Sequence, residues 1–158
     1  MRKCLTAIVA ALAVLAVTGA ASASVSEKPK PPVKLDGDVT NKGVGAVKAN
    51  AAEIEADDFF FTKTFIKGKA GTTVAVTLKN EGNTAHTFTI DAQDIDEEIQ
   101  PGDSVDVDVK IPKNGKAANF YCRFHVASGM QGALFSKAGG ASSAKKKADD
   151  SGSGGYGY

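Results

Sequence analysis

The chain has 158 residues, with 19 basic and 18 acidic side chains and a formal net charge of +1 when both histidines are neutral. A nearly neutral chain of this length gives no electrostatic argument for nucleic-acid binding, and it fits one small domain with flanking tails.

The first 23 residues predict a signal peptide for secretion. Arg2 and Lys3 form a basic start, residues 5–17 form an apolar run, and Ala21-Ser22-Ala23 resembles a cleavage site. An uncleaved membrane anchor is the alternative, but the apolar run is shorter than the roughly 20 residues that a spanning helix needs. We therefore expect cleavage before Ser24, export to the periplasm or the cell exterior, and no stable membrane insertion afterwards.

Two further segments flank the predicted domain. Residues 24–45 contain Lys28-Pro29-Lys30-Pro31-Pro32 and few large apolar side chains, which predicts a flexible linker with little to bury. Residues 138–158 consist mainly of Gly, Ser, Ala, Lys and Asp. Such a segment gains too little from burial to offset its ordering entropy, so it is expected to be a disordered tail.

The domain between them, residues 46–137, contains short apolar runs that alternate with polar residues. Side chains two apart lie on the same face of a strand, so this pattern predicts half-buried strands. Turn sequences such as Pro101-Gly102-Asp103 separate the runs. Six or more short strands of this kind favour an all-β sandwich or barrel. The predicted strands cover residues 52–56, 59–66, 72–78, 86–90, 105–111, 119–121 and 133–135.

One stretch of the domain is less regular. A single helical turn is compatible with residues 93–98. The acidic side chains in and before this stretch lack the regular spacing of a calcium-binding loop, so we expect a solvated loop. They are Asp91, Asp94, Asp96, Glu97 and Glu98.

The processed chain has four candidate soft metal ligands, and three of them lie in one short stretch. Without Met1 and Cys4, the chain keeps one cysteine, one methionine and two histidines, namely Cys122, Met130, His86 and His125. A single cysteine cannot form an internal disulfide, and an unpaired thiol in an exported protein needs an explanation. It could pair between chains, be buried and inert, or bind a metal.

Two imidazoles, one thiolate and one thioether are the ligands of a blue-copper site. The spacing is Cys-x2-His-x4-Met, and Cys122 follows the strand predicted for residues 119–121. His86 begins another predicted strand directly after a turn, so it can reach the same place. Each residue alone is commonly a surface histidine, a buried thiol or a core methionine. Together they predict that His86, Cys122, His125 and Met130 bind one copper ion.

These motifs resemble those of the cupredoxins, and most closely the plastocyanin-like members. The resemblance covers roughly residues 54–136, and the segment from Phe120 to Gly132 is its most specific part. It implies a Greek-key β-sandwich with one type 1 copper ion near one end. His86, Cys122 and His125 would be the near-planar ligands, and Met130 the weak axial ligand. The supporting motifs are Gly71-Thr72-Thr73-Val74, Thr84-Ala85-His86-Thr87-Phe88 and Pro101-Gly102-Asp103.

The sequence departs from the plastocyanin pattern at two places. Arg123 and Phe124 stand between the cysteine and the second histidine, without the proline often found there. Thr87 stands where plastocyanins carry an asparagine that braces the cysteine loop. Residues around the ligands tune a metal site, so these changes affect the reduction potential and the docking surface.

The function predicted from these residues is that of a secreted, monomeric carrier of single electrons between larger redox protein partners. It would dock through an apolar surface near one ligand histidine, to which Phe124 is a candidate contributor. A copper carrier or store that delivers the metal to another apoprotein is an alternative, as is a metal-free interaction module. One cysteine and two histidines exclude binuclear and multicopper centres. A cysteine–histidine hydrolase is formally possible, but nothing else indicates a substrate pocket, so we expect no enzyme.

Overall fold

The computed structural model describes residues 30–139. The predicted signal peptide, the start of the predicted linker and nearly all of the predicted tail lie outside these residues. The described part contains strands and two 3-10 turns but no α-helix. The elements are β1 (Val44–Ala46), β2 (Ala51–Asp57), β3 (Phe60–Phe61), β4 (Phe65–Lys67), β5 (Thr73–Asn80), β6 (His86–Ile90), η1 (Asp91–Gln93), β7 (Ile95–Ile99), β8 (Ser104–Lys110), β9 (Ala118–Tyr121), η2 (Val126–Ser128) and β10 (Gln131–Phe135).

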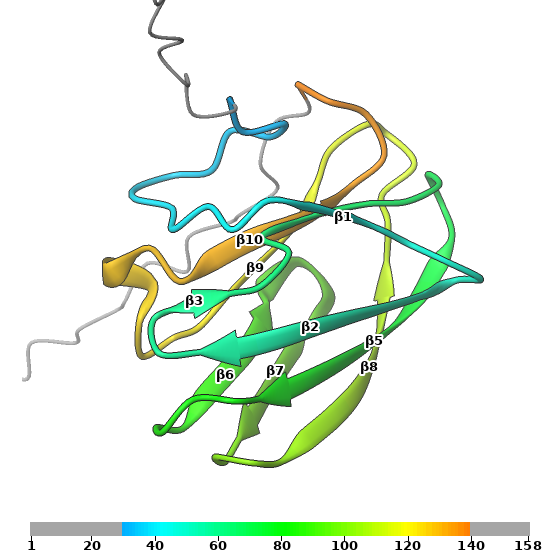
Figure 1. Ribbon diagram of the computed structural model, residues 1–158. Helices are drawn as coiled ribbons and strands as arrows, with labels where there is room; N and C mark the ends of the chain where they lie inside the picture. The colour runs from blue at the N-terminus through cyan, green and yellow to red at the C-terminus, as the bar shows by residue number, and fades with distance from the viewer. Residues whose placement is uncertain (1–29, 140–158) are drawn as a thin grey trace, which may run out of the picture.

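The strands form two sheets that pack face to face (Figure 1). One sheet has the order β1-β4-β10-β9-β6-β7 and the other the order β3-β2-β5-β8. Strands that are distant in sequence become neighbours, as where β9 lies beside β6 and β10 beside β4. The all-β sandwich predicted from the sequence is confirmed.

The core lies between the two sheets and follows the alternating pattern of the strands. In β5 the side chains of Val74, Val76 and Leu78 are fully buried, whereas the residues between them are exposed. Three phenylalanines form the centre, with Phe120 at ring-centroid distances of 5.1 Å from Phe61 and 5.0 Å from Phe88. Burying an apolar side chain of this size stabilises the fold by roughly 1.5–3 kcal/mol.

The segment before β1 packs on the domain more than the sequence indicates. Val33 and Leu35 are 1% and 8% exposed, and they join Phe65 and Phe135 in a second apolar cluster. The expectation that residues 24–45 bury little is therefore corrected for these two side chains. Val33 and Leu35 lack apolar neighbours in the sequence, but they pack against apolar side chains of the six-stranded sheet and are buried there.

The acidic stretch also differs from its prediction. The 3-10 turn lies at Asp91–Gln93, earlier than the helical turn considered for residues 93–98, and Ile95–Ile99 form the edge strand β7. Its acidic side chains are exposed while Ile99 is buried. Charged residues suit an edge strand because they discourage pairing with another chain.

The strand directions define two ends of the sandwich. His86 begins β6, Cys122 follows β9 and Met130 precedes β10, so all of the predicted ligands lie at the end where β2 and β5 finish, which we call the metal end. The opposite end, which we call the far end, carries the loops of residues 47–50, 68–72, 91–94, 111–117 and 136–139. Among residues 30–139, no helix has the length and apolar character to cross a bilayer.

Candidate metal centre

The loop that carries three of the predicted ligands is closed by its own backbone. The Cys122 N–H donates to Met130 O at 3.0 Å, the His125 N–H donates to Cys122 O at 3.2 Å, and the Met130 N–H donates to His125 O at 3.2 Å. The turn η2 ends at Gly129, whose φ of 85° lies in the left-handed region that glycine adopts without steric cost. The chain therefore reverses direction between the thiolate and the thioether.

The loop before His86 is fixed by a buried amide. The Asn80 side chain donates to Thr84 O at 2.8 Å and to Ile99 O at 2.9 Å, and its oxygen accepts from the Gly82 N–H at 3.0 Å. All of the side-chain groups of this fully buried asparagine are thus engaged. His86 consequently enters β6 from a loop with a defined path.

A second contact joins this loop to the turn between β2 and β3. The Asp58 carboxylate accepts from the backbone N–H of Asn83 at 3.0 Å and from its side-chain amide at 3.1 Å. Hydrogen bonds from the backbone and side chain of Asn83 lower the pKa of Asp58, and the nearby His86 and His125 lower it further. An ionised carboxylate therefore faces the two histidines.

Three of the four predicted ligands converge at the metal end. His86 Nδ1 lies 3.1 Å from His125 Nδ1, and Cys122 Sγ lies 3.8 Å and 3.5 Å from these two nitrogens. His86 and Cys122 are fully buried, whereas His125 is half-buried. Met130 is fully buried in the same apolar core cluster as Cys122.

The surroundings favour an uncharged imidazole at His86. Burial lowers the pKa of His86, and repulsion from His125 lowers it further. A neutral imidazole is the form that binds a metal. The other ring nitrogen, His86 Nε2, is buried and has no hydrogen-bond partner among the described residues. When Nδ1 is a ligand, Nε2 carries the ring hydrogen, so His86 lacks the protein acceptor that usually orients a metal-binding histidine.

The donor set fits copper in both number and kind. Donor atoms of His86, Cys122 and His125 lie within 4.8 Å of one another, which is compatible with bond lengths of roughly 2 Å to one shared first-row metal ion. Thiolate and thioether suit Cu(I), and imidazole suits either oxidation state. The His-Cys-His-Met set is typical of a type 1 copper site. The donor atoms of His86, Cys122 and His125 are grouped, and Met130 lies in the same loop as Cys122 and His125.

Thr87 braces the cysteine loop in place of the asparagine found in plastocyanins. Its backbone N–H donates to Cys122 Sγ at 3.4 Å, and its hydroxyl accepts from the Arg123 N–H at 2.8 Å. A hydrogen bond to sulfur stabilises the thiolate, and the hydroxyl fixes the backbone directly after it. The substitution at this position therefore keeps a brace between β6 and the ligand loop.

The sequence matches the family described as "Cupredoxin-like domain" over residues 7–135, which is more than half of the chain. The chain belongs to the cupredoxin family. The resemblance predicted from the motifs is confirmed, and with it the copper cofactor. Membership of this family agrees with the expectation that the protein is not an enzyme.

Several solved structures of low sequence identity match this cupredoxin over part of its length. An auracyanin from Roseiflexus castenholzii is 18% identical, covers 56% of this chain and 97% of its own, and has a TM-score of 0.48. Auracyanin A, a blue copper protein from Chloroflexus aurantiacus, is 19% identical, covers 59% and 100%, and has a TM-score of 0.45. The metal-binding domain of a Cu(I)-exporting P-type ATPase from Streptococcus pneumoniae is 13% identical, covers 61% and 97%, and has a TM-score of 0.49. A comparison with curated protein sequences found no match.

Exposed apolar side chains surround the half-buried histidine of this cupredoxin. Phe59, Phe124 and Val126 are 48%, 49% and 38% exposed. The ring of Phe59 lies edge-on to His125 with centroids 4.8 Å apart, and the ring of Phe124 lies 6.2 Å from it. We call these three residues the apolar collar.

Sequence reasoning anticipated Phe124 but missed Phe59. The signal that could have found it is the pair Asp57-Asp58, which interrupts an otherwise strand-like run and marks a turn. Phe59 has a φ of 68°, a left-handed conformation that is uncommon for a bulky residue. The turn holds this aromatic side chain against His125 in spite of that cost.

Proposed function

We propose that this cupredoxin is a secreted electron carrier that transfers single electrons between redox proteins through Cu(I)/Cu(II) cycling. The observation that supports this most directly is the half-buried His125, which joins the donor cluster to the apolar collar. An electron can pass through a ligand at the surface while the other near-planar donors, His86 and Cys122, remain buried.

Copper bound here would supply a one-electron redox couple. The chain's own contribution is a site that changes little when the charge on the metal changes. Thr87 fixes the thiolate from one side, and the backbone bonds between Cys122, His125 and Met130 fix the loop from the other. Donors that are already held in place need little rearrangement, so the barrier to transfer is low.

The collar suits a partner that binds briefly. Three partly exposed apolar side chains make a small contact area, and small contacts are characteristic of transient redox encounters. Secretion is supported by the basic start, the apolar run and the small-residue cleavage site of residues 1–23.

The test is the spectrum and redox cycling of the copper-loaded protein. Cu(II) should give an intense blue colour from charge transfer between thiolate and copper, and a reductant should bleach it reversibly. Cys122→Ser should remove the colour because the absorption belongs to the thiolate. A colourless Cu(II) complex of the wild type, or one that cannot be re-oxidised, would refute the proposal.

Electron self-exchange between the Cu(I) and Cu(II) forms separates electron transfer from copper delivery. A carrier should exchange electrons rapidly and release its metal slowly, whereas ready loss of Cu(I) to a chelator would favour delivery. Phe59→Ala combined with Phe124→Ala should slow self-exchange about tenfold, because losing about 1.4 kcal/mol of apolar contact reduces association by that factor. Val44→Ala is the matched control, since Val44 is 58% exposed but lies outside the collar.

A further inference from the structure

The far end of the sandwich carries a set of exposed lysines. Its loops, with the last residue of β4, carry six lysines against two aspartates, Asp91 and Asp94. Each of the lysines is exposed. They are Lys48, Lys67, Lys69, Lys113, Lys116 and Lys137, and we call them the far-end lysines.

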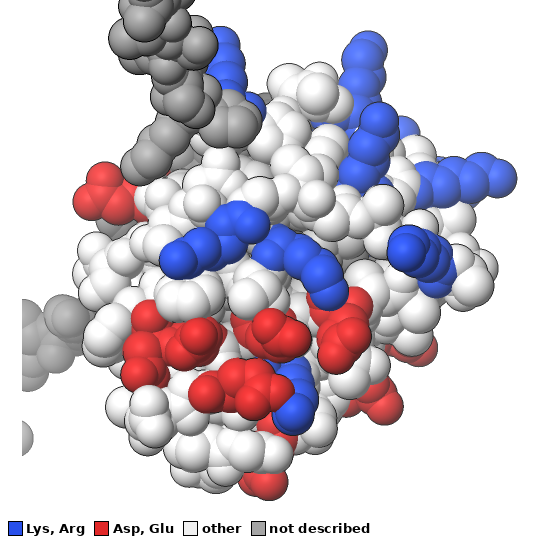
Figure 2. Space-filling model, viewed as in Figure 1, with Lys and Arg blue, Asp and Glu red and all other residues white. Residues whose placement is uncertain are grey.

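These loops form one continuous surface. The Val47 N–H donates to Lys67 O at 2.9 Å, the Gly68 N–H donates to Phe135 O at 2.9 Å, and the Gly71 N–H donates to Ile111 O at 2.8 Å. Figure 2 shows blue lysine side chains on the upper right of the molecule, over the ends of the strands, and red acidic side chains lower down over β2, β5 and β8.

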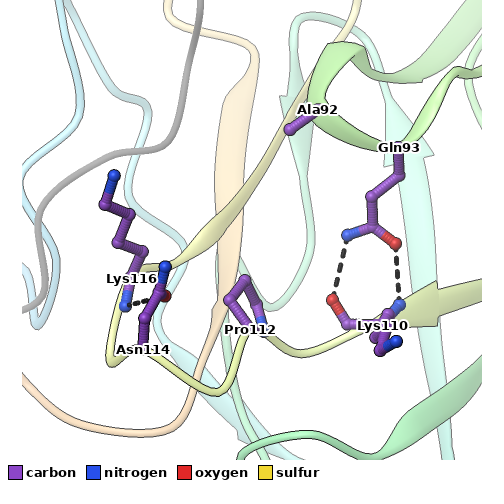
Figure 3. A pocket seen from close by; sticks show the side chains of 6 residues that line it. All are labelled: Ala92, Gln93, Lys110, Pro112, Asn114 and Lys116. Atoms are coloured by element: carbon purple, nitrogen blue, oxygen red, sulfur yellow. Dashed lines mark hydrogen bonds between the residues drawn. The ribbon is translucent and has the colours of Figure 1, made fainter.

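The far-end lysines form no ion pair with an acidic side chain among residues 30–139. The two ion pairs among residues 30–139 are Lys79 with Glu81 and Arg123 with Asp96, and neither involves this end. The amides nearby are also engaged, since Gln93 bonds to the backbone of Lys110 through both of its side-chain polar atoms and Asn114 accepts from the Lys116 N–H (Figure 3). The ammonium groups are therefore available to an external anion.

The shape of this surface argues against a small ligand. The hollow in Figure 3, which Lys110 and Lys116 help to line, has a volume of about 240 Å³, below the roughly 300–1,000 Å³ of typical ligand pockets. A larger hollow of about 400 Å³ beside Lys48 is also lined by Glu53, whose carboxylate would repel an anion. The charges are spread over four loops instead of converging on one point. Such a surface suits an extended anionic partner.

The metal end has the opposite charge. Asp57, Asp58 and Asp103 lie in or next to its loops, while Glu81 and Arg123 there are both in ion pairs, with Lys79 and Asp96. The molecule is therefore positively charged at the far end and negatively charged at the metal end. A negatively charged surface would attract the far end and repel the metal end.

We propose that the far end binds an anionic membrane surface and leaves the metal end facing away from it. A protein partner is less consistent with these residues, because protein interfaces are depleted in lysine and depend on buried aromatic or apolar anchors. No large apolar side chain of the described residues is exposed in these loops. Clusters of lysines without such anchors are the usual means of binding anionic lipid headgroups. The inference is independent of whether the copper site carries electrons.

The experiment measures how strongly the full chain prefers anionic vesicles. Partition constants are determined by flotation with vesicles of phosphatidylcholine alone and of phosphatidylcholine mixed with phosphatidylglycerol, and their ratio isolates the electrostatic contribution. One lysine near such a surface contributes about fivefold in affinity. Lys69→Gln, Lys113→Gln and Lys116→Gln together should therefore lower the ratio about 100-fold. High ionic strength should abolish the preference.

The matched control removes three lysines from other places, with Lys42→Gln, Lys63→Gln and Lys79→Gln, so that the net charge changes equally. Its ratio should stay close to that of the wild type, and circular dichroism should show the same fold for all three proteins. An equal loss in both triple variants would reduce the effect to net charge and overturn the proposal. Absence of any wild-type preference for anionic vesicles would overturn it too, and would leave an acidic protein as the partner to seek.

Discussion

Replacing Thr87 with valine tests whether the brace on the cysteine loop has the assigned role. The Arg123 N–H donates to Thr87 Oγ1 at 2.8 Å, the Thr87 and Thr89 hydroxyls are 3.1 Å apart, and Thr89 donates to Asp96 at 2.8 Å. Each hydroxyl has one hydrogen, and that of Thr89 goes to Asp96. The Thr87 hydroxyl must therefore donate to Thr89, which defines one direction along the whole chain of bonds.

Valine keeps the shape of Thr87 but removes both of these bonds. The Arg123 N–H would lose its acceptor and the Thr89 oxygen its donor, next to a position that is fully buried. Leaving buried polar groups unsatisfied costs about 1–3 kcal/mol, so the free energy of unfolding should fall by about 2 kcal/mol. In a domain of this size the melting temperature should drop by about 10 °C.

The assay is urea unfolding of the metal-free protein, with the visible spectrum of the copper-loaded protein as a second readout. Thr77→Val is the control, because Thr77 is exposed and its bond to Asp106 lies on the surface, so it should change stability by less than about 0.5 kcal/mol. The bond to Cys122 Sγ comes from the backbone of Thr87 and should survive, so the blue colour should persist. The assigned bonds are wrong if Thr87→Val costs no more than Thr77→Val.

Three further substitutions test the core, an ionisable group and the axial ligand. Gly132→Ala should destabilise the fold by about 3 kcal/mol in chemical denaturation, because its Cβ would overlap Thr64 O and the ring of Phe120; Gly45→Ala, which meets only a flexible lysine side chain, should be nearly neutral. Burial and a hydrogen bond to Asp91 raise the pKa of Tyr121 to about 12 from its ordinary value of 10.0. The stability that the protonated Tyr121 contributes is therefore lost as the pH rises across that interval, and Asp91→Asn should move the tyrosinate absorbance of Tyr121 toward lower pH. Met130→Leu should leave copper bound but shift the potential, because axial bonding is weak; complete loss of the metal would contradict a minor ligand role.

Strands with one buried face were predictable from the sequence. The alternation over residues 72–78 and 105–111 corresponds to β5 and β8, whose inward side chains fill the core. The strand at residues 95–99 was not predicted, because the edge strand β7 buries little besides Ile99. Its acidic side chains are tolerated at the edge of the sheet, where periodicity carries less information.

The donor set was predictable from residue types and spacing, because few side chains could serve as soft ligands. The geometry brings together the donor atoms of His86, Cys122 and His125 as expected. The contacts that hold these donor residues in place were harder to predict from the sequence. Gln131, for example, donates from its side chain to Asp36 O at 2.7 Å and Asp38 O at 2.6 Å. No local sequence pattern predicts a contact between residues so far apart in the chain, because such a contact forms only when the sheets have assembled.

The two ends of the sandwich differ in how their loops are held, and this difference fits separate roles. At the metal end, buried side chains such as Asn80 and Thr87 bond to the loop backbone, so the donors keep their positions. At the far end, the loops are joined by backbone bonds and their lysines extend into solvent. Charge can therefore change at the far end without moving a ligand. Substitutions there should alter where the protein binds but not its stability, whereas Thr87→Val should destabilise the ligand loop but leave membrane binding unaffected.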